Sequence, residues 1–229
     1  MKFLNYDKVL VLSPHPDDAE YGMLGAMMKF KDTMFDIVVL SDGGDFDEST
    51  KGSRREECKK VWEHIDNING SFMEDTKFIR ERNEDEWVHL LETKYDISTY
   101  DCIMSPPSND SHFEHQIVSN LPNALGRREQ CGIIHYKTVS ILDTWIPNFF
   151  VDLGVIENRD TEDGHSNGTH TLFMACIRYA KTNKLTHFES QQKKQYFQED
   201  SIKSFHSHFG CSKRGIDFVE EFHIVRGYN

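Results

Sequence analysis

Short apolar runs alternate with amphipathic stretches along the first half of the chain. The runs at 8–13, 35–41 and 101–105 are mostly apolar and show no polar-apolar alternation. Such runs are typical of strands buried on both faces of a parallel sheet. Stretches with apolar residues at helical spacing follow them, for example at 19–30 and 117–125. Repeated strand-helix units of this kind predict an α/β fold with a mostly parallel central sheet covered by helices.

The pattern is weaker beyond residue 150. Segments 172–180 and 189–205 have helical character, and 218–225 has the character of a strand. The segment 158–168 is acidic and contains glycine, which predicts an exposed loop. No internal repeat, low-complexity segment or linker divides the sequence, so we expect a single domain over residues 1–229.

Composition and charge exclude some classes of binding partner. The chain has 229 residues and a formal net charge of −12, and it contains no basic stripe. This argues against broad binding to nucleic-acid backbones or anionic membranes; Arg127-Arg128 and Lys193-Lys194 are the nearest approach to a basic patch. The five cysteines are scattered without a C-x-x-C motif, and residues 1–7 do not resemble a signal peptide. We therefore expect reduced thiols and a cytoplasmic protein.

Metal-binding residue types follow the first apolar run directly. The segment 13–18 reads SPHPDD, which places His15, Asp17 and Asp18 on a loop stiffened by two prolines. Burying so many polar groups at the end of a strand costs free energy unless these groups bind a ligand. Imidazole and carboxylate together suit Zn²⁺.

A second polar cluster follows the run at 101–105. Residues 109–115 read NDSHFEH, with His112 and His115 separated by two residues. Loops after neighbouring parallel strands meet at one edge of a sheet, so the two clusters can converge there. Taken alone, H-P-D is usually a turn, and H-x-x-H at a helix start usually has a surface or capping role. Together they favour a zinc site with one His and one Asp from the first cluster, one His from the second, and an open position for water.

These blocks resemble the PIG-L/LmbE-like N-deacetylases. This family includes the N-acetylglucosaminyl-phosphatidylinositol, mycothiol-precursor and bacillithiol-precursor deacetylases. Its signature, a buried strand followed by (A/S)-H-P-D-D-x-E, resembles residues 13–20, and its acid followed by H-x-D-H resembles residues 110–115. Its R-x-x-E matches residues 54–57. Further matches near the end of the chain are Ser190-Gln191, Gly215, Phe218, Glu220 and Phe222.

The resemblance implies a Rossmann-like three-layer sandwich and a specific set of metal ligands. These are His15, Asp18 and His115, holding Zn²⁺, although Fe²⁺ or Co²⁺ can use the same ligands. Asp17 would be the general base that activates a water molecule for attack on the amide carbonyl.

The remaining site residues are also implied by the resemblance. Protonated His112 would stabilise the oxyanion, and Glu114 would hydrogen-bond His112 to keep it charged. Arg54 would contact the substrate or the product carboxylate, although Arg55 is an alternative for this role. Two departures are visible, because Phe113 and Glu114 stand where the family usually has Pro and Asp.

The expected function is zinc-dependent hydrolysis of an N-acetyl amide on an amino sugar or glycoside. Two alternatives stay open: an amidohydrolase of a non-sugar amide, and a catalytically silent metal-binding member. Neither the natural substrate nor the oligomeric state follows from the sequence, and a homo-oligomer is left open. The segment 157–185 has no clear counterpart in the family. Trp145 is open to two interpretations, as a platform for a sugar ring or as part of the core.

Overall fold

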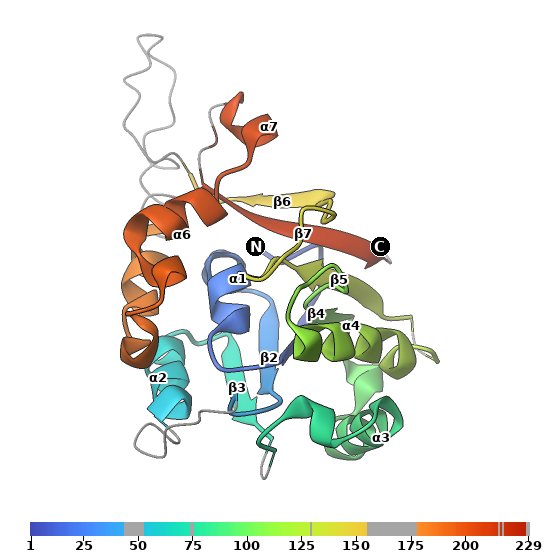
Figure 1. The fold of residues 1–229 in the computed structure, drawn as a ribbon. Coiled ribbons are helices and arrows are strands. Elements are labelled where there is room, and N and C mark those ends of the chain that lie inside the picture. Colours follow the sequence, from blue (N-terminus) through green and yellow to red (C-terminus); the bar gives the residue numbers. More distant parts are fainter. Residues whose placement is uncertain are drawn as a thin grey trace, which may run out of the picture.

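The computed structural model places seven strands in one sheet (Figure 1). It describes residues 1–43, 53–73, 76–128, 130–154, 178–214, 216 and 218–227. The strands are β1 (Lys8–Ser13), β2 (Met34–Val39), β3 (Ile68–Phe72), β4 (Cys102–Ser105), β5 (Gly132–Tyr136), β6 (Phe149–Asp152) and β7 (Val219–Arg226). Their order is β3-β2-β1-β4-β5-β7-β6.

The first five strands are parallel, and the last two are not. β1 pairs in parallel with β2 and β4, and the parallel pairing continues to β3 and β5. β7 runs antiparallel to both β5 and β6. The sheet is therefore mostly parallel, as the sequence predicts.

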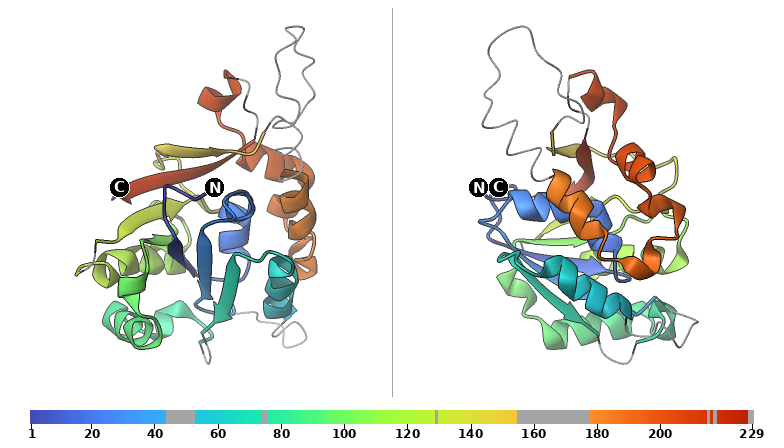
Figure 2. Two further views of the ribbon diagram at one scale, coloured as in Figure 1. Left: turned by 180° about the vertical axis from the view of Figure 1, so that it is seen from behind. Right: turned by 90° about the vertical axis from the view of Figure 1, so that its left-hand side faces the viewer.

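Helices cover both faces of the sheet (Figures 1 and 2). They are α1 (Asp18–Lys29), α2 (Ser53–Trp62), α3 (Glu84–Lys94), α4 (Phe113–Leu125), α6 (Glu199–Phe205) and α7 (Phe209–Ser212). Residues 178–185 are also helical, and single 3-10 turns occur at Ile79–Glu81, Ile97–Thr99, Glu189–Gln191 and Gln195–Phe197.

The two faces of the sheet have separate apolar cores. Val9 and Val11 of β1 pack with α1, α2 and the C-terminal helical segment, whereas Leu10 and Leu12 pack with α3 and α4. Successive side chains of a strand point to opposite faces, so a strand that is apolar at every position serves both cores. This confirms the prediction of a three-layer α/β fold.

The C-terminal half differs in detail from the expectation. The predicted helix over 189–205 is two 3-10 turns followed by α6, because Gln198 is extended with φ −74° and ψ 146°. The predicted strand at 218–225 is β7. The predicted loop at 158–168 and most of the predicted helix at 172–180 lie outside the described residues.

Candidate active site

The loop after β1 is held in an unusual backbone conformation. Asp17 has φ 102°, in the left-handed region that non-glycine residues seldom adopt. Strain of this kind costs about 1–3 kcal/mol and is concentrated at functional sites. The Ser13 hydroxyl donates to the His15 carbonyl at 2.8 Å and accepts from the Ala19 amide at 3.3 Å, which ties the loop to the start of α1. The two carboxylates have different partners: Asp17 pairs with Arg54, whereas Asp18 lies against His15 and His115.

Asp18 lies between two imidazoles. Its Oδ2 is 3.1 Å from Nδ1 of His15 and 3.1 Å from Nε2 of His115. His15 follows β1 and His115 lies in the first turn of α4, after β4, so the carboxyl ends of two adjacent parallel strands bring the groups together. Ring nitrogens of His15, His112 and His115 lie within 4.8 Å of one another. The three predicted ligands, His15, Asp18 and His115, are therefore in mutual contact, and His112 lies beside them.

A carboxylate anchors the other ring nitrogen of each of these two histidines. Nε2 of His15 lies 2.7 Å from Oε2 of Glu114, and Nδ1 of His115 lies 2.8 Å from Oδ2 of Asp110. Asp110 is fully buried and also accepts from the Ser140 hydroxyl at 2.6 Å. Metal-ligating histidines typically show such an anchor, which fixes the tautomer and the ring orientation.

The partner of Glu114 differs from the expectation. The resemblance pairs Glu114 with His112, but in the structure its carboxylate is bound to His15. His112 stands at the N-cap position of α4, two residues before Glu114, and residues two apart on a helix do not face each other. The side chain of Glu114 is directed toward the β1 loop instead.

The charges of the cluster depend on one another. Burial raises the pKa of the Asp18 carboxyl, but the adjacent His115 and His15 together outweigh burial and hold that pKa well below its usual range. Burial also opposes a charge on His115, yet Asp18 and Asp110 raise its pKa to about 10. His115 thus carries a proton between two carboxylates, at the place where a bound metal ion would displace it. The donor set of two imidazoles and one carboxylate fits Zn²⁺.

Of the two candidate arginines, Arg54 is the one at the site. It is buried, and its Nη2 donates to Oδ2 of Asp17 at 3.0 Å and to the Pro16 carbonyl at 2.5 Å. Arg55 instead binds the Asp42 carboxylate and donates to the Met73 carbonyl. Burial raises the pKa of Asp17, and the Arg54 guanidinium partly offsets this.

His112 is the exposed member of the histidine group. Partial burial of its ring lowers its pKa, and the neighbouring His15 and His115 lower it further. The neutral imidazole is therefore favoured over the protonated form that the resemblance implies. A neutral imidazole still offers one N–H donor.

The outlying motif residues have structural contacts. The Glu57 carboxylate accepts from the amide of Ser190 at 2.8 Å and from its hydroxyl at 2.7 Å, which joins the C-terminal segment to α2. Glu220 accepts from the amides of Gly25 and Ala26 in α1. It also pairs with Lys181, whose side chain is fully buried. These contacts position the elements around the cluster.

Two residues of the candidate site were not predicted from the sequence. Ser140 and Thr138 both donate to Asp110 from a segment about 30 residues further on. Asp110 itself stands in the second motif block, so the acid preceding H-x-x-H was the available signal. No local sequence pattern indicates the two hydroxyl donors, Ser140 and Thr138.

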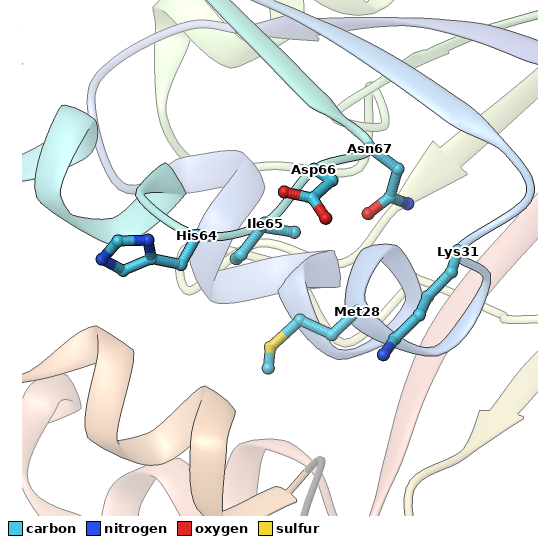
Figure 3. A pocket seen from close by; sticks show the side chains of 6 residues that line it. All are labelled: Met28, Lys31, His64, Ile65, Asp66 and Asn67. Atoms are coloured by element: carbon cyan, nitrogen blue, oxygen red, sulfur yellow. The ribbon is translucent and has the colours of Figure 1, made fainter.

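A separate pocket of about 250 Å³ lies at the opposite end of α1 (Figure 3). Met28 and Lys31 from the end of α1 line it together with residues 64–67 of the α2–β3 connection. At 1.5 Å per residue, α1 separates this pocket from Asp18 by about 15 Å. It is therefore not part of the candidate active site.

Comparisons with known proteins place the chain in one family. Residues 10–125 match the family described as GlcNAc-PI de-N-acetylase (PIG-L). A comparison with curated protein sequences gave no match.

Solved structures share the fold. N,N'-diacetylchitobiose deacetylase from Pyrococcus horikoshii is 21% identical, with a TM-score of 0.59 over 97% of this chain and 85% of that one. The 4-carboxy-2-hydroxymuconate hydratase GalB from Pseudomonas putida KT2440 is 14% identical, with a TM-score of 0.68 over 100% and 98%. A teicoplanin deacetylase, solved in a zinc-inhibited form, is 9% identical with a TM-score of 0.60 over 97% and 99%. At these identities the likeness shows the fold, which one of the three uses for a different reaction.

Proposed function

Since the chain belongs to the PIG-L family of de-N-acetylases, whose members hydrolyse amide bonds, we propose that it is a zinc-dependent deacetylase of N-acetylated amino sugars. The observation that carries the proposal is the position of Asp18 Oδ2, 3.1 Å from a ring nitrogen of each of two anchored histidines. Beside it stands a second carboxylate, Asp17, which has a different partner.

The proposed metal ligands are Nδ1 of His15, a carboxylate oxygen of Asp18 and Nε2 of His115. Glu114 and Asp110 hold the remaining ring nitrogens and so leave these two free to bind a cation. When bound, zinc would polarise the acetyl carbonyl and lower the pKa of a water molecule.

Asp17 is the proposed general base. Burial makes its carboxylate more basic, and Arg54 orients it through a 3.0 Å hydrogen bond to Oδ2. A carboxylate beside the ligand Asp18 is well placed to take the proton of the attacking water. Arg54 keeps Asp17 ionised, and we assign it this role in addition to contact with the substrate.

His112 is the proposed oxyanion donor. Its ring stacks on His115 with centroids 4.5 Å apart, and its exposure leaves it facing the position that a substrate would occupy. Among the described residues no side-chain hydrogen bond holds its ring, unlike the rings of His15 and His115. It is thus free to donate to a substrate oxygen.

The substrate class rests on the family and its relatives. The family is described by an N-acetylglucosamine substrate, and the Pyrococcus relative by diacetylchitobiose. We therefore propose a small N-acetylated amino sugar or glycoside. A non-sugar amide would use the same machinery.

The test combines metal analysis with amine release. Wild type, Asp17→Asn, His112→Ala and His115→Ala would be assayed on a panel of N-acetyl amino sugars and on simple N-acetyl amides. Asp36→Asn serves as the matched control, since Asp36 is a buried aspartate outside the site. We expect about one zinc per active site in all proteins except His115→Ala. Loss of activity should be about 10²–10⁴-fold in Asp17→Asn and about 10²–10³-fold in His112→Ala.

Each part of the proposal can fail separately. Full activity in zinc-free protein would refute the metal, and full activity in Asp17→Asn would refute the general base. Turnover of simple amides but not of sugars would select the non-sugar alternative. Stable zinc binding with no turnover of any compound would favour the silent member.

A further inference from the structure

A pocket with two histidines in its lining lies beside the loop that connects β4 with α4, the same loop that carries Asp110 of the candidate active site. Its volume is about 330 Å³. It is lined by Pro107, Ser108, Asn109, His135, Thr144, Trp145, Ile146, His223 and Val225.

The β4–α4 loop separates this pocket from the cluster. Asn109 lines the pocket, whereas the next residue, Asp110, is bound to His115. Asp110 forms a single antiparallel bridge with Ile141, and its carboxylate is fully engaged by His115, Thr138 and Ser140. The two sites therefore share a wall but no ligand.

The pocket contains a cross-strand pair of histidines. His135 of β5 is directly opposite His223 of β7 in the antiparallel register. Side chains paired in this way lie on the same face, with Cβ atoms about 4.5–5.5 Å apart. Both residues are half-buried, so solvent can reach them.

Hydrogen bonds fix the tautomer of both rings. Nδ1 of His223 lies 2.7 Å from the Ile146 carbonyl, which can only accept, so this nitrogen carries the proton. Nδ1 of His135 lies 3.1 Å from Oγ of Ser105, whose own proton is donated to the Pro106 carbonyl at 2.9 Å. His135 must therefore also donate from Nδ1. In each ring Nε2 is left as the nitrogen with a free lone pair.

His135 keeps this neutral form over a wide range of pH. Burial lowers its pKa to about 4, and the adjacent His223 adds to the effect. A neutral imidazole with its second nitrogen bound to a backbone carbonyl or hydroxyl is the usual state of a histidine that ligates a metal.

We propose that His135 and His223 form a second metal site, which takes a divalent transition ion such as Cu²⁺, Ni²⁺ or Zn²⁺ through their Nε2 atoms. Neutral imidazoles favour these ions over Mg²⁺ or Ca²⁺. Two imidazoles from opposite positions of adjacent strands can converge on one ion, and water fills the remaining positions. Asn109 and Thr144, which are linked to each other by a 3.0 Å hydrogen bond, add oxygen atoms to the same pocket.

Trp145 provides a local reporter for this site. Its ring centroid lies 5.8 Å from that of His223, and its Nε1 has no hydrogen-bond partner in the described structure. The other two tryptophans, Trp62 of α2 and Trp87 of α3, are buried elsewhere in the core and do not line the pocket. A paramagnetic ion at the histidine pair would quench the fluorescence of Trp145 selectively.

The experiment titrates metal-free full-length protein with Cu²⁺ and follows tryptophan emission. The His115→Ala background weakens the catalytic cluster, so that the second site is seen alone. We expect saturable quenching, removed by Trp145→Phe and shifted to about tenfold or more higher Cu²⁺ by His223→Gln. His89→Gln, which changes an exposed histidine of α3, is the matched control and should titrate like its parent.

A second readout does not require the His115→Ala protein to be stable. Zinc bound per wild-type chain after equilibration should fall by one equivalent in His135→Gln and in His223→Gln, with thermal unfolding confirming that both are folded. Equal Cu²⁺ titrations for His223→Gln and His89→Gln, or unchanged zinc stoichiometry, would overturn the proposal. Zinc lost only with the pair, and not with His115→Ala, would support this site while refuting the catalytic metal.

Discussion

Replacement of Asp110 by Asn tests the candidate metal site without touching a ligand. Asp110 is fully buried and binds Nδ1 of His115 at 2.8 Å, the Ser140 hydroxyl at 2.6 Å and the His112 amide at 2.7 Å. Burial raises its pKa, but His115 and the hydroxyls of Ser140 and Thr138 together outweigh burial and lower the pKa below its ordinary value. It is therefore an anion at neutral pH, and Asn removes the charge while keeping the shape.

The magnitude follows from the tautomer of His115. The Oδ2 position of Asp110 accepts hydrogen bonds from His115 and Thr138, so an NH₂ group there would face two donors. In either orientation of the new Asn side chain, one of the hydrogen bonds to position 110 is lost. Otherwise the proton of His115 must shift from Nδ1 to Nε2, the atom that faces Asp18. Loss of such an anchor typically weakens metal binding about 10–100-fold. This corresponds to about 1.4–2.8 kcal/mol.

The assay is a competition titration of metal-free protein and a chromophoric chelator for Zn²⁺. The matched control is Asp36→Asn, another buried aspartate, which binds the Tyr100 hydroxyl at 2.7 Å and Asn69 at 3.1 Å. Asp36→Asn should bind zinc like wild type, even if its unfolding free energy falls. Zinc affinity that is unchanged in Asp110→Asn, or reduced equally in both variants, would refute the assignment of Asp110 as the anchor.

Other consequences concern the packing around the site. Lys181→Met leaves the Glu220 carboxylate buried without its cation and should reduce the free energy of unfolding by about 3–5 kcal/mol in urea denaturation. The double variant Lys181→Met/Glu220→Gln should recover part of this loss. Equal stability of the single and double variants would contradict the prediction. Gly25→Ala would place a Cβ 2.4 Å from the nearest side-chain carbon and should cost about 1–3 kcal/mol, whereas Gly227→Ala, with its nearest neighbour at 3.5 Å, should melt like wild type. Burial holds the pKa of His206 well below its ordinary value, so the unfolded chain takes up the proton first, and His206 makes stability fall as pH drops below about 6.5. His206→Gln should flatten that slope in unfolding measured from pH 7 to pH 5, and an identical slope would argue against it.

The central strands were predictable from the sequence, and the edges were not. β1 and β2 are largely apolar on both faces because both are packed by helices, and this shows directly in the sequence. β3 is a half-exposed edge strand with the sequence INGSF, which lacks any run of apolar residues. Its Gly70 is required by packing, since the Trp62 ring lies 2.1 Å from where a Cβ would be. Nothing local in the sequence shows that contact.

The same contrast holds for the candidate site. The convergence of His15, Asp18 and His115 was predictable because each lies in a short motif at the end of a predicted strand. The anchoring of Asp110 by Ser140 spans 30 residues, and the choice of Arg54 over Arg55 depends on which face of α2 meets Asp17. Such contacts depend on the packed structure and not on local sequence.

The exchange of Asp for Glu at position 114 removes none of the contacts that a metal site needs. The longer side chain reaches Nε2 of His15 at 2.7 Å, and its other oxygen accepts from the Arg80 amide at 3.4 Å. His15 is therefore anchored by Glu114, as His115 is by Asp110. A catalytically silent member would be under no demand to keep both anchors, a strained Asp17 and its arginine partner. Their joint presence argues for an active enzyme. Any difference from other family members in substrate specificity is therefore expected in the residues that line the site and not in the catalytic groups.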